Sequence, residues 1–228
     1  MCGRVVYVWD AETGRLVKKV DDRALDDPDR RHVLEKKRYN VPPASHLPVF
    51  AADGDKARVE IARWGFPIPQ RPNGVFNTRI ETAFESPLWR GLIGQFHCAF
   101  PVKGFYEWEH DGAKRPHFIH RADGKTMLLG AVIGKRRVKD EEKLCASIVT
   151  CKPNSLVATL HDRMPVVLEE KDLDEWLHPE VAGHERILEL ASPAGNVLAM
   201  HPVGSAVNST KNDSPELPEP ATQRTLEG

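Results

Sequence analysis

The chain has 228 residues, of which 40% are hydrophobic and 29% charged, as in an ordinary globular domain. Its formal net charge of −1 shows no excess of cationic side chains, which argues mildly against a nucleic-acid binder. No apolar run approaches the ~18 residues that a membrane span needs, and no signal-peptide pattern is present. We expect a cytoplasmic protein, most simply a monomer, with no association with membranes.

Prolines and charge divide the first half of the chain. Pro42 and Pro43 end a charged segment, period-two alternation marks a strand before Gly65, and Ser86-Pro87 suits the start of a helix. The elements predicted here are a helix over 28–37, an extended path over 38–43, a strand over 59–64, a loop over 67–74 and a helix over 86–95.

The second half is mostly short apolar or alternating runs separated by glycines and charged turns, which is typical of antiparallel sheet. We predict strands over 97–102, 104–109, 116–121, 127–133, 145–151, 163–168 and 197–203, with helical segments over 153–160, 171–177 and 185–191. The fold class is therefore α+β: a single mainly-β domain over residues 1–212, with antiparallel sheets or a barrel-like core and short peripheral helices. Residues 213–228 are rich in Pro and Glu without periodicity, and we predict a disordered C-terminal tail.

Cys2 is the second residue, so removal of Met1 would place a cysteine at the amino terminus. Such a residue carries an amine and a thiol on adjacent carbons, with reference pKa values of roughly 8 and 8.5. An aldehyde can form a Schiff base with the amine and then be captured by the sulfur in a five-membered thiazolidine ring. The alternative is a cysteine that stands second by chance.

The four cysteines form no close pairs, so we predict neither a disulfide framework nor a structural metal site, and no cofactor is expected.

Three further segments place polar side chains in apolar or glycine-rich surroundings. Asn77 and Arg79 share one face if their segment is extended, and they offer an amide and a phosphate-binding fork; a polar turn is the alternative. Glu107 stands among aromatic residues, where desolvation would raise its pKa, unless it is an ordinary exposed strand residue.

The third segment joins His161, a proton carrier near neutral pH, to Arg163, a cation suited to phosphate. Its alternative is a helix C-terminus where cationic side chains meet the dipole. Thr150 could supply a hydroxyl, or it could be a buried threonine bonded to the backbone.

These segments, taken together and in order, resemble the SOS-response-associated peptidase family, SRAP. The matching pieces lie at 1–4, 38–43, 64–65, 77–82, 104–108, 160–166, 201–203 and 207–208, and they span about residues 1–212. In one departure, the family commonly has a tryptophan shortly after the Trp-Gly step. This chain has none at 66–72, and Arg71 could compensate through charge.

The resemblance implies a sensor of abasic sites in single-stranded DNA, which forms a covalent thiazolidine crosslink through Cys2 and shields the lesion. It also implies autopeptidase activity on Met1 and an abasic-site lyase activity. Asn77 would position the amine and sugar, Glu107 would manage protons, and His161 would act as acid and base on the sugar and in reversal. The residues implied at the DNA are Arg4, Arg79 and Arg163 on phosphates, Trp64 in the same wall, and Pro43 and Thr150 lining the pocket.

Two other functions are compatible with the same residues. A glutamine amidotransferase with an N-terminal nucleophile also starts Met-Cys-Gly, although no glutamine-pocket segment follows here. A non-catalytic reader of single-stranded or modified DNA would leave Cys2 incidental.

Overall fold

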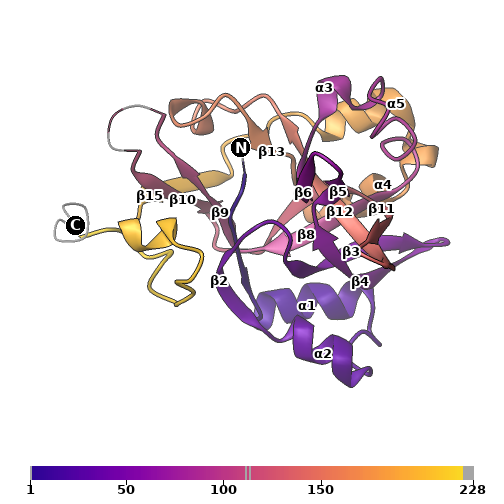
Figure 1. Cartoon of the computed structure of the whole chain (residues 1–228), viewed down its shortest axis with the longest axis horizontal. Helices are drawn as coiled ribbons and strands as arrows, with labels where there is room; N and C mark the ends of the chain where they lie inside the picture. Colours follow the sequence, from indigo (N-terminus) through magenta and orange to yellow (C-terminus); the bar gives the residue numbers. More distant parts are fainter. Residues whose placement is uncertain (1, 111, 113, 223–228) are drawn as a thin grey trace.

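The computed structural model describes residues 2–110, 112 and 114–222, together with all side chains in that part except those of residues 72 and 73. Its centre is a closed barrel in which neighbouring strands follow the order β12-β4-β3-β8-β11, and β11 pairs with β12 again to complete the circle (Figure 1). The barrel strands are β3 (His46–Asp53), β4 (Lys56–Trp64), β8 (His97–Val102), β11 (Met127–Val138) and β12 (Glu141–Cys151).

Short strands extend the barrel at one side. β7 (Asn77–Arg79) runs parallel to β12, whereas β13 (Met164–Pro165) pairs antiparallel with the end of β12 and β14 (Val167–Leu168) pairs with β11. The register places Asn77 opposite Ile148 and Arg79 opposite Thr150. Closure leaves the barrel strands without open edges, which suits a small mainly-β domain.

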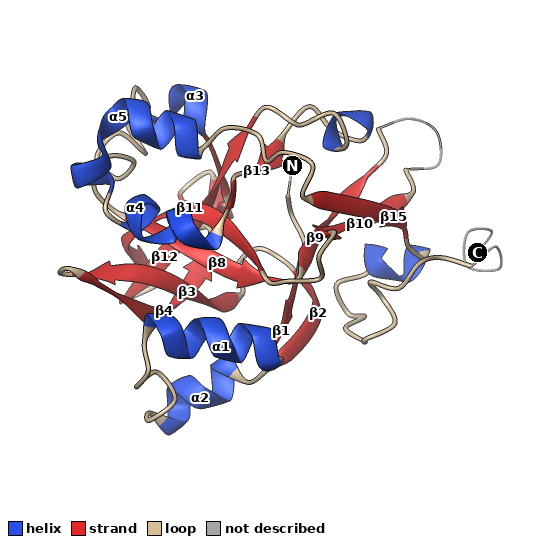
Figure 2. Ribbon diagram, turned by 180° about the vertical axis from the view of Figure 1, so that it is seen from behind, coloured by secondary structure: helices blue, strands red, loops and turns tan. Residues whose placement is uncertain are grey.

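A second sheet has five strands in the order β15-β10-β9-β1-β2, all antiparallel. Its members are β1 (Val5–Val8), β2 (Lys37–Val41), β9 (Gly104–Trp108), β10 (Pro116–Arg121) and β15 (Leu198–Pro202). The chain passes from barrel strand β8 into β9 through Lys103 alone, so the second sheet is attached directly to the barrel. The amino-terminal strand β1 lies at this junction, as both ribbon views show (Figures 1 and 2).

Helices cover two ends of the barrel (Figure 2). α1 (Ala11–Val20) and α2 (Pro28–Leu34) lie at one end, and α3 (Ile80–Ala83) and α5 (Pro179–Leu190) lie toward the other. α4 (Leu173–Leu177) leads into α5 and faces α1 across a cavity. Asp10 caps α1 by accepting a hydrogen bond from the backbone N–H of Thr13 at 2.9 Å. The 3₁₀ turns are η1 (Val157–Thr159), η2 (Glu170–Asp172) and η3 (Ser205–Asn208). None of the helices in the described part of the chain is long and apolar enough to cross a bilayer.

The predicted fold class, α+β and mainly β, is confirmed, and so are the strands over 97–102 and 116–121. Two elements were predicted wrongly. The proline-rich segment 67–74 is not a loop, because β5 (Phe66–Ile68) and β6 (Arg71–Val75) pair as a hairpin, which packs Phe66 edge-on against Trp89. Residues 86–95 form successive turns and no continuous helix, although they carry hydrogen bonds of the helical spacing.

The segment predicted as a tail also differs from expectation up to residue 222. Leu217 is buried in a small cluster with Val207 and Phe118, and the backbone N–H of Ala221 donates to the carbonyl of Pro202 at 2.8 Å. Asp213 caps the backbone of β2 by accepting from the N–H of Asn40 at 3.2 Å. Pro and Glu content therefore did not prevent packing, since a few apolar side chains suffice to anchor a short segment. The rest of the predicted tail, 223–228, lies outside the described residues.

Gly104 begins β9, directly after the connection from the barrel, and its position leaves no room for a side chain. A Cβ there would overlap the carbonyl oxygen of Ile119 and lie 2.6 Å from the ring of Phe118. We expect Gly104→Ala to lower the free energy of unfolding by about 2–3 kcal/mol through overpacking, as measured by urea denaturation. Gly94→Ala is the matched control, because no atom lies within 4 Å of the added carbon, and its unfolding free energy should stay near that of the wild type. Equal losses in the two variants would contradict this account.

Candidate functional site

Pairing of β1 with β9 fixes the position of the second residue. Val5 lies opposite Phe105, and the backbone N–H of Tyr106 donates to the carbonyl of Arg4 at 3.0 Å. Because the two strands are antiparallel, residues before Val5 run alongside those after Phe105, and Cys2 comes beside Glu107. Strand pairing alone therefore brings the ends of two elements, about a hundred residues apart in sequence, to one place.

Cys2 lies at the bottom of this junction and is only 1% exposed. Its carbonyl accepts a hydrogen bond from the side-chain amide of Asn77 at 2.9 Å. Burial raises the pKa of the thiol far above its ordinary value, and the nearby Glu107 carboxylate raises it further. The sulfur is thus held as a neutral thiol, which must give up its proton to a base before it can attack. Met1 lies outside the described residues, so its predicted removal stays a prediction.

Glu107 is a buried carboxyl group at the end of β9, with 5% of its surface exposed. Burial raises its pKa, while the positive charge of the amino terminus and a hydrogen bond from the backbone of Trp108 oppose the rise. The predicted upward shift is confirmed, and the alternative of an exposed strand residue is excluded. Such a group exchanges protons more readily near neutral pH than an ordinary carboxylate does.

Asn77 belongs to a strand, and the alternative of a polar turn is wrong. Its amide nitrogen Nδ2 donates a hydrogen bond to the carbonyl of Cys2. Its oxygen Oδ1 is buried and has no hydrogen-bond partner among the described residues. A buried, unused acceptor is costly unless a ligand or water supplies the donor. This oxygen can therefore accept a hydrogen bond from a bound molecule next to Cys2.

His161 follows η1 in the connection to β13, and its side chain is partly buried. Burial lowers its pKa to about 4, aided by the positive charge of the amino terminus. The backbone N–H of Arg163 donates to Nδ1 at 3.0 Å, which leaves the proton of the neutral ring on Nε2. Asp162 Oδ1 also lies 2.7 Å from Nδ1, a contact that is attractive only with a proton there; the lowered pKa favours the neutral ring.

The three predicted arginines occupy different environments. Arg79 is exposed, and its guanidinium makes no hydrogen bond or ion pair with any other described residue. Arg4 is partly buried and donates to Asn40 Oδ1 at 2.9 Å and to the carbonyl of Val207 at 3.1 Å.

Arg163 is buried and forms a two-pronged ion pair with Glu81, with both N–O distances at 2.7 Å. It also donates to the carbonyl of Thr150 at 2.6 Å, so its guanidinium is not directed at solvent. Arg163 therefore ties β12 and α3 together, while its buried Nε has no partner among the described residues. The expected phosphate contact stays a prediction, which would require the pair with Glu81 to open.

Trp64 and Thr150 are likewise part of the supporting structure. Trp64 is fully buried, donates to the carbonyl of Phe76 at 3.0 Å and packs edge-on against the Phe76 ring. Thr150 is fully buried and donates to the carbonyl of Thr78 at 3.3 Å, as the alternative interpretation had it. The two residues hold β7 in place, and through it Asn77, from behind. Pro43 is partly exposed just after β2 and remains a candidate for the pocket rim.

Two functional neighbours were not predicted. Asn40 is 1% exposed and donates through Nδ2 to the carbonyls of Val207, Ser209 and Asn212 while it accepts from Arg4. It lies inside the matching segment 38–43, which was the signal available in the sequence. His110 packs its ring 4.7 Å from that of His161, and no sequence spacing indicates this contact.

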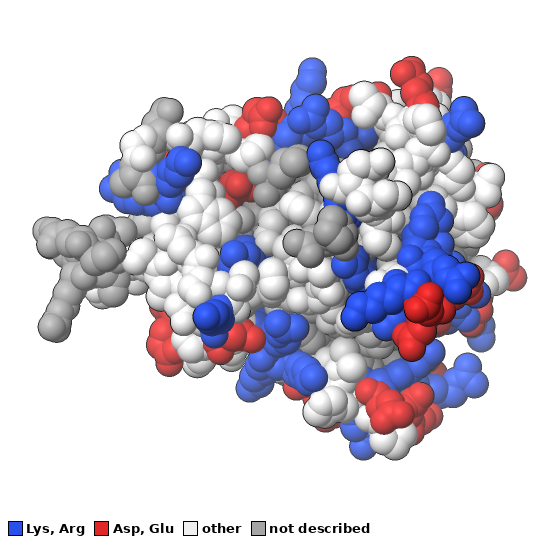
Figure 3. All heavy atoms as spheres, viewed as in Figure 1, with Lys and Arg blue, Asp and Glu red and all other residues white. Residues whose placement is uncertain are grey.

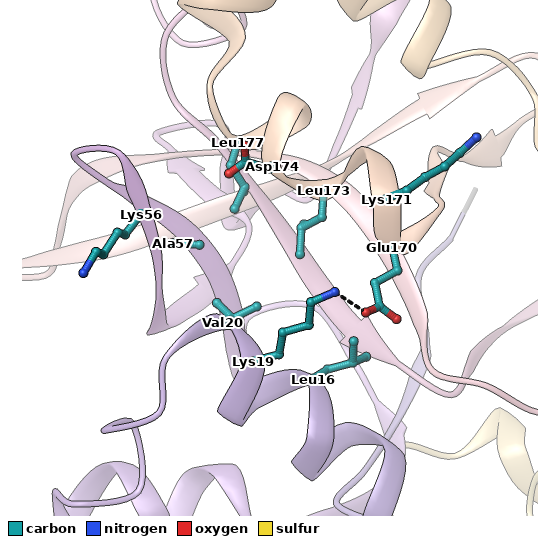
Figure 4. A pocket seen from close by; sticks show the side chains of 10 residues that line it. All are labelled: Leu16, Lys19, Val20, Lys56, Ala57, Glu170, Lys171, Leu173, Asp174 and Leu177. Atoms are coloured by element: carbon teal, nitrogen blue, oxygen red, sulfur yellow. Dashed lines mark hydrogen bonds and ion pairs between the residues drawn. The ribbon is translucent and has the colours of Figure 1, made fainter.

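A cavity of about 540 Å³ opens beside His161. Its lining includes Glu109, His110, His117, His161, Asp162 and Met200. Another cavity, of about 420 Å³, lies between α1 and the η2–α4 segment, where Lys19 is paired with Glu170 (Figure 4). It contains none of the predicted site residues, and we assign the chemistry to the first region.

Surface charge is unevenly distributed despite the small net charge. On the face seen in Figure 3, Lys and Arg side chains form separate clusters with uncharged surface between them. Local cationic patches can attract a polyanion without any overall excess of positive charge.

Residues 1–210 match the family model described as SOS response associated peptidase (SRAP). The chain belongs to the SRAP family. Abasic site processing protein YoqW of Bacillus subtilis (strain 168) is 32% identical, with 79% of this chain and 85% of that protein covered. Abasic site processing protein YedK of Escherichia coli (strain K12) is 31% identical, with 80% and 84% covered.

The architecture agrees with solved structures as well. A crystal structure of a protein from Bacteroides thetaiotaomicron superimposes with a TM-score of 0.79 at 22% identity, over 96% of this chain and all of the other. This match supports the SRAP fold. In the hairpin that lacks the family's common tryptophan, Arg71 is exposed, and the Phe66 ring is buried under the guanidinium of Arg136 at 5.0 Å.

The raised pKa of Glu107 has a consequence for stability. A carboxyl group whose pKa is higher in the folded protein favours folding at pH values below its unfolded pKa, and that contribution is lost as pH rises through the folded pKa. Glu107→Gln, which cannot ionise, should therefore unfold at higher urea concentration than wild type at pH 8, and the difference should shrink toward pH 4.5.

Glu109→Gln is the control, because Glu109 is partly exposed and paired with Arg115 at 3.1 Å. It should give no gain at pH 8. A Glu107→Gln protein with the same pH-independent stability difference throughout would show that burial does not shift this group.

Proposed function

We propose that this SRAP protein captures abasic sites in single-stranded DNA through a covalent bond to Cys2, exposed as the first residue once Met1 is removed. The observation that carries the proposal is the position of Cys2. Its carbonyl accepts a hydrogen bond from the side-chain amide of Asn77, and its thiol is close enough to Glu107 for the carboxylate to raise the pKa of the thiol. The names of the relatives, abasic site processing proteins, supply the substrate. Capture would shield the lesion from strand breakage.

The chemistry proceeds in two additions. The amine of Cys2 attacks the open-ring aldehyde of the abasic sugar, and loss of water leaves a Schiff base. The thiol then adds to the same carbon, its proton passes to the nitrogen by way of a base, and a thiazolidine ring closes. Glu107 is suited to both proton transfers because its raised pKa lets it take and return a proton near neutral pH.

His161 acts on the sugar side of the site. Its ring is neutral with the proton on Nε2, which can donate to the sugar when the sugar ring opens. Transfer of the ring proton to Nδ1, where Asp162 Oδ1 lies 2.7 Å away and would accept it, frees Nε2 to take a proton from the sugar hydroxyl. The same transfers in reverse order would release the DNA. Asn77 Oδ1, a buried acceptor without a partner among the described residues, would hold the amine or a sugar hydroxyl in line.

Two associated activities also depend on Cys2. A Schiff base at the sugar makes β-elimination possible, which would give an abasic-site lyase activity. In the unprocessed chain, attack of the Cys2 thiol on the carbonyl carbon of the preceding peptide bond would transfer the methionyl group to sulfur and free the Cys2 amine. Hydrolysis of that thioester by water would release methionine and restore the thiol, which gives the autopeptidase activity. We propose that both run in a monomer and need no catalytic metal.

Phosphate binding falls to arginines that face solvent. Arg79 follows Asn77 by two residues in β7, and its exposed guanidinium forms no hydrogen bond or ion pair with other described residues. Arg4 lies two residues from Cys2 and keeps part of its surface exposed. Pro43 and Arg71 would border the DNA path, whereas Trp64, Thr150 and Arg163 support its walls from the interior.

The decisive measurement is a denaturing gel after incubation with abasic single-stranded DNA. Wild-type protein should give a heat-stable shifted band, and Cys2→Ala should give none. Cys2→Ser keeps the amine, so it should yield an adduct only when borohydride reduces the Schiff base.

Intact mass spectrometry of each protein first establishes that Met1 is absent. A Cys2→Ala protein that crosslinks as efficiently as the wild type would contradict capture through Cys2. One that binds DNA while the wild type also fails to crosslink would indicate a non-catalytic reader, and glutaminase activity in the wild type would indicate an amidotransferase.

The salt dependence of capture distinguishes a phosphate contact by Arg79 from a structural role of Arg163. Arg79→Ala should slow capture and reduce the slope of log rate constant against log salt by about 0.7, as expected for one phosphate contact on a single strand. Arg163→Lys should leave that slope unchanged while lowering stability, since one amine cannot replace the two-pronged pair with Glu81. A slope that changes in Arg163→Lys and not in Arg79→Ala would reverse the assignment.

A further inference from the structure

Three potential metal ligands converge at the mouth of the cavity beside the site. They come from two segments: His110 follows β9, and His161 and Asp162 precede β13. We propose that they bind a divalent cation of the zinc class, and that the bound ion takes His161 out of proton transfer. The site would thus be inhibitory, which is compatible with catalysis that needs no metal.

The geometry is close to what such an ion requires. One ligand atom from each residue lies within 4.8 Å of the other two. Tetrahedral zinc with bonds of about 2.1 Å places its ligand atoms about 3.4 Å apart, so the group must contract by little more than an ångström. His110 and Asp162 are both exposed and can make this movement. His161 offers a lone pair to the ion once its proton moves from Nε2 to Nδ1, or once Nδ1 gives up the hydrogen bond from the backbone N–H of Arg163.

The donor set selects the class of cation. Two imidazoles and one carboxylate suit zinc, copper or nickel, whereas magnesium and calcium prefer oxygen ligands. Three protein ligands leave a fourth position for water or for a group from bound DNA. Glu109 lines the same cavity and adds negative charge near the ion, and the cavity of about 540 Å³ gives it a path of entry.

The inhibitory half of this inference rests on the proposed function of His161, but the binding half does not. Binding is therefore measured first, by isothermal titration calorimetry with zinc chloride in the Cys2→Ala background. That background removes the amino-terminal aminothiol, which would itself chelate zinc. We expect one bound ion per chain.

Single substitutions in this background locate the ion. His110→Ala and Asp162→Asn should each weaken zinc binding about tenfold or more, because each removes one of three ligands. His117→Ala is the matched control, since its histidine lines the same cavity outside the ligand group and should leave the affinity unchanged. Absence of zinc binding, or equal binding in the His110→Ala and His117→Ala proteins, would overturn the site.

The functional arm uses proteins with Cys2 intact, loaded with abasic single-stranded DNA in chelator-treated buffer. Transfer to competitor DNA should slow several-fold when zinc is added to the wild-type crosslink, and much less for the His110→Ala crosslink. If zinc binds at the three residues yet release is unaffected in the wild type, the inhibitory role is wrong. Failure of the proposed function is distinguishable, because no crosslink would form even without zinc.

Discussion

The rest of the structure depends on one constraint: strand β1 pairs with β9 so that Cys2 and Glu107 share a buried corner. Removing a thiol and a carboxyl group from water disfavours the charged form of each, and the nearby Glu107 carboxylate raises the pKa of the thiol further. Both shifts depend on the packing that keeps water out of this corner. The reactivity of the site is therefore a property of the barrel and the sheet together.

That corner is secured from two sides by buried residues. Behind Asn77, the buried Trp64 bonds to the carbonyl of Phe76, and Arg163 clamps α3 to β12 through Glu81. On the other side, Asn40 binds three carbonyls of the segment after β15. These hydrogen bonds fix backbone that lies outside the regular ladders, where loss of a partner would expose a buried polar group.

The fold class could be predicted from the sequence because short apolar or alternating runs between turn residues mark antiparallel strands locally, as in the segment 97–102. It could not reveal barrel closure, which depends on contacts between β11, β12 and β4 far apart in the chain. For the site, the desolvation of Glu107 could be inferred from its aromatic neighbours. The partners of Arg163 could not be, because residue type specifies what a guanidinium can bind and not whether phosphate or Glu81 is nearer.

Burial also separates the two directions of the proposed reaction. Cys2 and Glu107, which would close the thiazolidine, are almost wholly inaccessible, whereas His161 borders an open cavity with His110 and Asp162 exposed beside it. Dissolved ions can therefore reach the ring of His161 directly from the cavity. In the proposed reaction release can then respond to the surroundings through His161, while Glu107 exchanges its protons deeper in the site, since the two steps place their proton carriers at different depths.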